Sequence, residues 1–143
     1  MNNTANELGI KTLLIAVIEK DDAILMRKKP EGSLPYKETW YLFGCERVLN
    51  QDDSKTISEY IKKILNIDIH SVVQIGEDSE VKQDHDGIVK KFIYIDFSSF
   101  YKSGLPKTPE GTEKVEWIPK EKIKEYDIVP PSKKLLKKIG YLN

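Results

Sequence analysis

Residues 44–69 read GCERVLNQDDSKTISEYIKKILNIDI, and this stretch decides the fold. Its apolar side chains recur with the spacing i, i+3, i+4, i+7 and i+8, at Ile57, Tyr60, Ile61, Ile64 and Leu65. That spacing is one face of an amphipathic helix. Asp53 or Ser54 is expected to cap the helix by accepting hydrogen bonds from its first free N–H groups. Asn66 tolerates the left-handed conformation in which many helices end, so the helix is expected to stop there.

The layout around this helix resembles the box of the Nudix family, G-x5-E-x7-R-E-U-x-E-E-x-G-U, in which U is a bulky apolar residue. A Trp-x-Leu-Pro-Gly-Gly run enters that box and a Gly-Leu-Asp-Ile-like run leaves it, where this chain has WYLFGC at 40–45 and NIDI at 66–69. Aligning the exits places Cys45 on the first Gly and Asn66 on the last. The acidic and arginine positions of the box then hold Gln51, Glu59, Tyr60, Lys63 and Ile64. No glutamate of the motif has an acidic counterpart in this alignment.

A shift of the alignment by one residue is the alternative. It places Gly44 on the first Gly and Glu59 on the Glu of the Arg-Glu pair, which restores one acid. It also places Lys62 and Lys63 on the adjacent Glu-Glu pair. The glutamate pair is therefore missing in both alignments.

The resemblance implies what these positions do in the family. Nudix enzymes cleave pyrophosphates with a divalent cation, Mg²⁺ or Mn²⁺, held by the box glutamates, and Mg²⁺ requires oxygen ligands. A unit charge pair at 4 Å is worth about 4 kcal/mol at an effective dielectric near 20, so an ammonium in place of a carboxylate beside a divalent ion costs on the order of 10 kcal/mol. Lys63 therefore argues against a metal site, and no cofactor is predicted. Mg²⁺ or Mn²⁺ enters only if other ligands replace the box, with Glu59 as a candidate.

The rest of the chain alternates predicted strands and helices. Strands are expected at residues 12–18, 23–27, 40–43, 72–81, 88–97 and 114–118. Asp86-Gly87 is a hairpin signal between two of them, and a loop is expected over 98–112. Short helices are expected to begin at Pro119 and Pro130, where proline suits the first helical turn. This order, with the resemblance, predicts an α/β (α+β) fold: a Nudix-like α/β/α sandwich with a mixed β-sheet between helices.

Composition limits the class of protein. The chain has 143 residues, with 23 basic and 23 acidic side chains, so its zero net charge gives no argument for a nucleic-acid or membrane partner. One cysteine, Cys45, cannot form an internal disulfide. Residues 1–10 are expected to be a flexible tail and 11–143 a single domain. A cytoplasmic protein is the default expectation, and the resemblance also implies a homodimer as one assembly.

Charged and aromatic side chains near the box are candidate ligand-binding groups. One hypothesis gathers Arg27, Lys28, Arg47 and Lys63 into a cationic floor for an anionic ligand. Lysine and arginine bind phosphate directly. Tyr36 and Trp40 are candidates to stack on a nucleobase, and Glu46 is an acid close to the box. The alternatives are ordinary surface charges and core aromatics.

Three functions remain open at the level of sequence. The first is an impaired or inactive Nudix-fold homologue that binds a nucleotide-like or phosphorylated small molecule. The second is a divergent active hydrolase that cleaves a nucleoside diphosphate linked to another moiety, using relocated metal ligands. The third is a protein-interaction module with a vestigial cleft, for which a cleft filled by side chains is expected. Fold alone does not choose among them.

Overall fold

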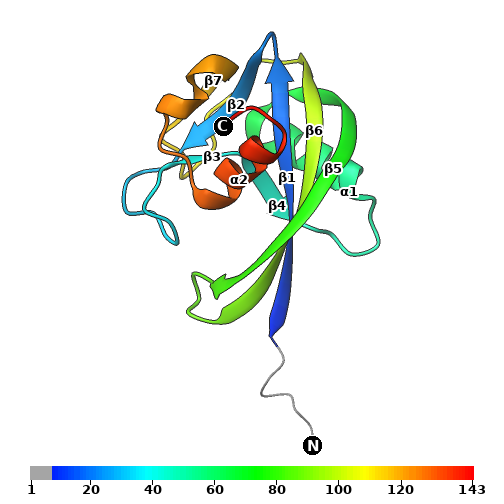
Figure 1. Cartoon of the computed structure of the whole chain (residues 1–143). Coiled ribbons are helices and arrows are strands. Elements are labelled where there is room, and N and C mark those ends of the chain that lie inside the picture. Colours follow the sequence, from blue (N-terminus) through cyan, green and yellow to red (C-terminus); the bar gives the residue numbers. More distant parts are fainter. Residues whose placement is uncertain (1–7) are drawn as a thin grey trace, which may run out of the picture.

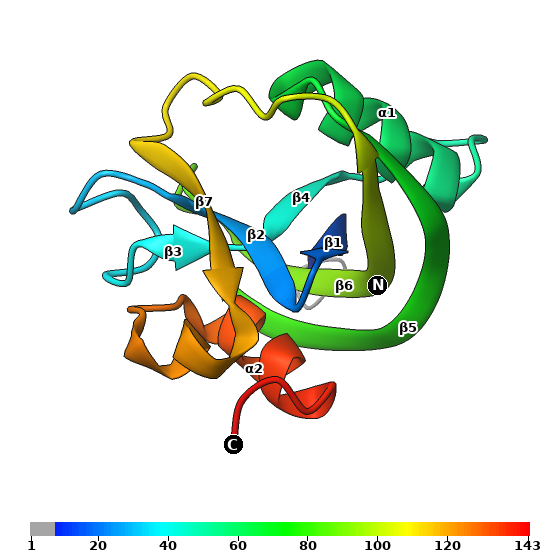
Figure 2. The same ribbon diagram turned by 90° about the horizontal axis from the view of Figure 1, so that it is seen from above.

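A seven-stranded sheet forms the centre of the protein, with α1 on one face and α2 on the other (Figures 1 and 2). This computed structural model describes residues 8–143. Its elements are β1 (Gly9–Lys20), β2 (Ala23–Lys28), β3 (Trp40–Tyr41), β4 (Phe43–Glu46), α1 (Asp53–Leu65), β5 (Asp68–Gln83), β6 (Val89–Ser103), β7 (Lys114–Pro119), the 3₁₀-helix η2 (Lys120–Glu125) and α2 (Pro130–Lys138). None of the helices in the described residues is long and apolar enough to cross a membrane.

The sheet is mixed, as the sequence predicted. Its strands follow the order β3-β2-β1-β6-β5, while β4 pairs with β1 and β7 pairs with β2. Strands β1 and β6 run parallel from the Gly9–Lys90 pair to the Glu19–Phe100 pair, and the other pairs are antiparallel. The expected α/β/α sandwich is confirmed.

Strand β1 supplies both cores because its side chains alternate between the two faces of the sheet. Leu14, Ala16 and Ile18 pack in the cluster that contains the apolar face of α1. Val17 packs in the opposite cluster, with Leu135 and Leu136 of α2. Full burial of such an aliphatic side chain contributes about 1.5–3 kcal/mol. The sheet is thus fixed between two independent apolar layers.

Helix α1 confirms the periodicity argument but begins at a different cap. Ile57, Ile61 and Leu65 are fully buried. The N-cap is Asp52, whose carboxylate accepts from the Lys55 N–H at 3.1 Å, so the expectation of Asp53 or Ser54 was wrong. Asn66 ends the helix with φ of 63°, and its N–H donates to the Lys62 carbonyl.

Several strand boundaries differ from the predictions. Strand β1 begins at Gly9, two residues before the expected domain start at 11, and residues 1–7 of the expected tail lie outside the described part. The predicted strand 40–43 is two strands, because β3 pairs with β2 and β4 pairs with β1. The hairpin strands are longer than predicted: β6 continues to Ser103, so the predicted loop 98–112 begins only after that residue.

Candidate functional site

The positions that the resemblance aligns with the box acids lie on and before α1. Gln51 donates through Nε2 to Glu59 Oε1 at 3.0 Å and accepts from Thr56 Oγ1 at 2.9 Å. Tyr60 and Ile64 are partly buried and pack against the core cluster beneath the helix. Lys63 is exposed. These side chains therefore serve packing and helix-surface hydrogen bonds in this structure.

This donor set does not fit a divalent cation. The box-equivalent side chains provide one carboxylate, Glu59, and it already accepts from Gln51. Within residues 8–143, no group of three or more His, Cys, Asp or Glu side chains is arranged to hold a metal ion. Because Mg²⁺ needs several oxygen ligands in near-octahedral geometry, we assign no step to a metal.

The candidate cationic floor is not assembled as one surface. Arg47 forms a two-point ion pair with Asp53, with Nε–Oδ1 at 3.1 Å and Nη2–Oδ2 at 2.9 Å. Lys28 lies 3.7 Å from Glu113. Of the four cations proposed from the sequence, Arg27 lines a cleft.

That cleft has a volume of about 300 Å³, and its lining includes Ile15, which packs against the apolar cluster on the α2 side of the sheet. Its floor comes from β1 and β6, and its walls come from the segment after β2, the end of β5 and the start of α2. Lining side chains include Lys11, Leu13, Ile15, Arg27, Lys29, Tyr36, Tyr41, Lys82, Phe92, Tyr94, Pro131 and Ser132, and Gly44 contributes backbone. Pockets that take small ligands are commonly this size or larger, apolar in lining and marked by a few polar groups.

In the lining of the cleft, Arg27 and Tyr41 each carry a buried polar atom that lacks a partner within residues 8–143. They face one another across the β2–β3 pair. Arg27 Nε and Tyr41 Oη are both buried without a hydrogen-bond partner among the described residues. Buried polar atoms without partners are rare because each costs about 1–3 kcal/mol of desolvation. Two of them in one cleft point to a ligand that would satisfy them.

The cleft carries more positive than negative charge. Four lysine or arginine side chains line it with one acid, Asp84, which pairs with Lys11 at 3.2 Å. Arg27 and Lys29 have no carboxylate within 4 Å among residues 8–143. Burial lowers the pKa of Lys29, and repulsion from the Arg27 guanidinium lowers that pKa further. Burial likewise lowers the pKa of Lys82, although Glu80 opposes the shift. A negatively charged group in the cleft would stabilise the charged form of both lysines and so offset the cost of their burial and the repulsion from Arg27.

Aromatic rings surround these cations. Lys29 Nζ lies 4.3 Å from the Tyr41 ring centroid, and Lys82 Nζ lies 4.3 Å from Tyr36 and 4.5 Å from Phe92. The Tyr36 hydroxyl donates to Glu80 at 3.0 Å. The cleft thus combines flat apolar surfaces with positive charge, which suits an anionic ligand that carries a ring.

The other sequence candidates lie outside this cleft. Trp40 is 6% exposed and packs edge-on against Tyr126 at 4.9 Å between centroids, so it is a core residue rather than a stacking platform. Glu46 is exposed, 3.9 Å from Lys11. Cys45 is partly buried, and burial raises the pKa of its thiol to about 11, which keeps it protonated and unreactive at neutral pH.

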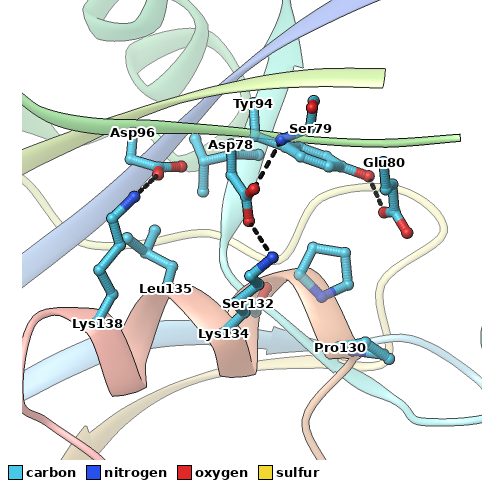
Figure 3. A pocket seen from close by; sticks show the side chains of 12 residues that line it. Asp78, Ser79, Glu80, Tyr94, Asp96, Pro130, Ser132, Lys134, Leu135 and Lys138 are labelled. Carbon is cyan, nitrogen blue, oxygen red and sulfur yellow. Dashed lines mark hydrogen bonds and ion pairs between the residues drawn. The ribbon is translucent and has the colours of Figure 1, made fainter. Parts of the chain in front are cut away.

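A second cavity, of about 110 Å³, opens between α2 and the β5–β6 hairpin and shares Ile15, Tyr94, Pro131 and Ser132 with the cleft (Figure 3). We call it the recess. Asp96 lines it and is 3% exposed. Burial raises the pKa of Asp96 to about 6, although Lys138 opposes the shift. Asp96 was not among the site residues predicted from the sequence. The signal for it was an acid at alternate spacing after Phe92 and Tyr94 of β6.

The protein resembles known proteins in structure and not in sequence. The sequence matches no protein-family model, and no curated protein sequence matches it. Solved structures do match. A MutT protein from Bacillus halodurans superposes with a TM-score of 0.74 at 18% identity, covering 89% of this chain and 80% of its own. A MutT Nudix hydrolase from Burkholderia pseudomallei gives 0.74 at 16% identity, covering 91% and 98%.

The chain has the Nudix fold. The Nudix domain of Shewanella oneidensis NrtR, solved with ADP-ribose, is also similar, with a TM-score of 0.68 at 10% identity over 97% of this chain and 91% of that domain. Identities this low establish the Nudix fold alone. On this Nudix fold, the box-equivalent positions occupy α1, whereas the open cleft lies under α2.

Proposed function

We propose that the cleft binds a nucleotide-like or phosphorylated small molecule, and that the protein does so without ordinary Mg²⁺-dependent pyrophosphate hydrolysis. The observation that carries the proposal is the Arg27–Tyr41 pair, with two buried polar atoms that lack partners in the described part of the chain. Lys29 lines the same cleft and has no ion-pair partner among those residues. Phosphate oxygens accept from guanidinium and hydroxyl groups and neutralise the local charge. The rings of Tyr36 and Phe92 provide apolar surface for an attached base or sugar.

Two further observations support the proposal. The box-equivalent side chains provide one carboxylate, which is hydrogen-bonded to Gln51. A Nudix domain of similar fold has been solved with ADP-ribose, a ligand of the proposed class. The open volume of about 300 Å³ argues against the interaction module, for which a cleft filled by side chains is expected.

Binding measurements test the proposal directly. We expect isothermal titration with ADP and ADP-ribose to give saturable binding that is the same in EDTA and in Mg²⁺. Arg27→Gln removes the charge and the buried Nε donor, so the affinity should fall roughly tenfold or more in protein that melts cooperatively. Lys63→Glu should leave the affinity unchanged, because Lys63 lies on the exposed side of α1.

The same measurements discriminate the alternatives. Loss of binding in Lys63→Glu, with Arg27→Gln unaffected, would return the anion site to α1 as the sequence hypothesis has it. Binding that requires a divalent cation would favour the divergent active hydrolase. No saturable binding of either ligand by folded protein would reject the proposal.

A further inference from the structure

The recess beside the cleft has an acceptor with no hydrogen-bond partner. Asp96 is 97% shielded from solvent, yet its carboxylate accepts no hydrogen bond among the described residues; its nearest cation is Lys138, with Nζ 3.7 Å from Oδ2. Gly76 lies opposite Asp96 in the β5–β6 pair, and because it has no side chain, the Lys138 ammonium can occupy the space beside Asp96. A Cβ at Gly76 would lie 2.7 Å from Lys138 Nζ. At 3.7 Å, Lys138 forms an ion pair with the Asp96 carboxylate but donates no hydrogen bond to it.

The other acids on the recess wall already have partners (Figure 3). Asp78 pairs with Lys134 at 2.8 Å. Glu80 accepts from the hydroxyls of Tyr36 and Tyr94. Among the acids that line the recess, Asp96 therefore retains free acceptor capacity. Arg27 and Lys29 line the cleft and not the recess.

We propose that the recess is a specificity subsite in which the Asp96 carboxylate accepts hydrogen bonds from the N–H edge of the ligand's heterocyclic base. This inference rests on the proposed function, because it assumes that the phosphate end lies against Arg27. The shared lining of the two cavities lets one ligand reach from one end to the other. The Asp96 carboxylate itself is unsuited to bind the phosphate end, since the two negative charges repel.

The chemistry of a carboxylate selects among bases. An ionised carboxylate only accepts, through two parallel oxygens, so it suits two neighbouring N–H donors. Guanine presents such a pair, hypoxanthine presents one donor on that edge, and adenine presents one donor beside an acceptor. A buried acceptor opposite an acceptor leaves both unsatisfied, which is the basis of strong discrimination.

The charges around Asp96 set the pH at which this selection operates. Glu77 and Asp78 of β5 raise its pKa, Lys138 of α2 lowers it, and burial has the largest effect. Two other charged residues, Glu80 and Lys134, line the same recess. Strand β1 adds the uncharged Ile15 to the lining. With a pKa of about 6, the carboxylate is ionised at pH 7.5 and loses its charge below pH 6. The preference for a base with two neighbouring N–H donors should therefore weaken as the pH falls from 7.5 to below 6.

Titration calorimetry with GDP, IDP and ADP at pH 7.5 tests the inference. We expect GDP to bind roughly tenfold more tightly than IDP, because IDP loses one hydrogen bond to a charged group. ADP should bind most weakly, because adenine places its N1 acceptor against the carboxylate. Asp96→Asn should bring the three affinities together without abolishing ADP binding. Asp68→Asn is the matched control, since Asp68 begins β5 and lines neither cavity.

Each other outcome overturns the inference in a distinguishable way. Equal affinities for the three nucleotides in the unaltered protein would reject the subsite and leave the proposed function standing. An equal loss of affinity for all three in Asp96→Asn would assign Asp96 a structural role. No binding of any nucleotide would reject the proposed function and the subsite together.

Discussion

Asp96 is a residue whose position in the sheet conflicts with its chemistry. It lies on β6 between two apolar layers, where a charged carboxylate is costly unless it is paired and hydrogen-bonded. Its partner Lys138 lies at 3.7 Å and is 43% exposed at its side chain, so the pairing offsets little of that cost. A residue kept at such a cost is a candidate for function rather than for stability.

The raised pKa of Asp96 makes a prediction about stability. A folded-state pKa of about 6, above the ordinary value of 3.8, means that the folded protein binds this proton more tightly than the unfolded chain does. The stabilising contribution is therefore present below pH 3.8 and is lost as pH rises through 6. Asp96→Asn should raise the free energy of unfolding at pH 7.5 by on the order of 1 kcal/mol, and less at pH 5.

Urea unfolding at pH 5 and pH 7.5 measures this difference. Asp68→Asn is an informative comparison, because hydrogen bonds from Lys62 and Ser103 lower the pKa of Asp68, so its removal should destabilise the protein at pH 7.5. A destabilised Asp96→Asn at pH 7.5, or a gain independent of pH, would contradict the assignment.

At the residue scale, the sequence predicted those residues whose role follows from local spacing. It missed those whose role depends on contacts between different strands. The buried face of α1 follows from its spacing, and the left-handed Asn66 follows from its position after that face. Lys29 directly follows β2 and contacts the Tyr41 ring because β2 pairs with β3, and no local sequence pattern reports that pairing. Trp40 stood at the box entrance in sequence, yet its ring packs into the core because β3 pairs with β2.

At the scale of elements, the segment after β6 closes the end of α1. Lys107 N–H donates to the Leu65 carbonyl at 2.9 Å, which satisfies one of the free carbonyl groups at the helix end. Gly104, with φ of 101°, brings the chain against the residues that follow the helix. The prediction of a glycine- and proline-containing loop here is correct in kind, and its late start reflects the six-residue extension of β6 beyond Phe97.

Gly104 and Gly111 of this loop both have a positive φ, but only Gly104 lies against other backbone atoms, so comparing them distinguishes the cost of steric contact from the cost of backbone conformation. A Cβ at Gly104 would lie 2.4 Å from the Asn66 carbonyl oxygen and 3.0 Å from Ile67 Cα, and backbone atoms cannot move aside cheaply. Gly111 has a positive φ of 78° but no atom within 4 Å of its Cβ position. Gly111→Ala should cost about 1 kcal/mol, and Gly104→Ala about 3 kcal/mol or more.

Chemical denaturation of the two alanine variants gives the comparison. A larger loss of stability in Gly104→Ala is expected, with lowered protection from hydrogen exchange at the C-terminal end of α1. Equal losses in the two variants would show that the close approach to Asn66 contributes nothing.

At the scale of the whole molecule, the Nudix fold carries two separate surfaces. The face under α1 is a packed core, with Tyr60 and Ile64 contributing to it. The face that carries α2 also has a packed apolar cluster, and the cleft and the recess open beside that cluster. The order of strands and helices was predictable because each element carries its own pattern. The cleft and the recess were not predictable, because their walls come from elements that are distant in sequence.

The protein is expected not to hydrolyse the pyrophosphate substrates of Nudix enzymes. Release of phosphate or nucleotide from nucleoside triphosphates, ADP-ribose, dinucleoside polyphosphates and capped RNA should stay at the uncatalysed rate in Mg²⁺, Mn²⁺ and EDTA. The physical reason is that uncatalysed pyrophosphate cleavage is slow unless developing charge is neutralised, and Glu59 is the one carboxylate at the box-equivalent positions. Metal-dependent turnover that disappears in Glu59→Gln would identify Glu59 as a ligand. Metal-dependent turnover that persists in Glu59→Gln would mean that acids from other elements, such as Glu110 or Glu113 of the loop after β6, complete a metal site in the bound state.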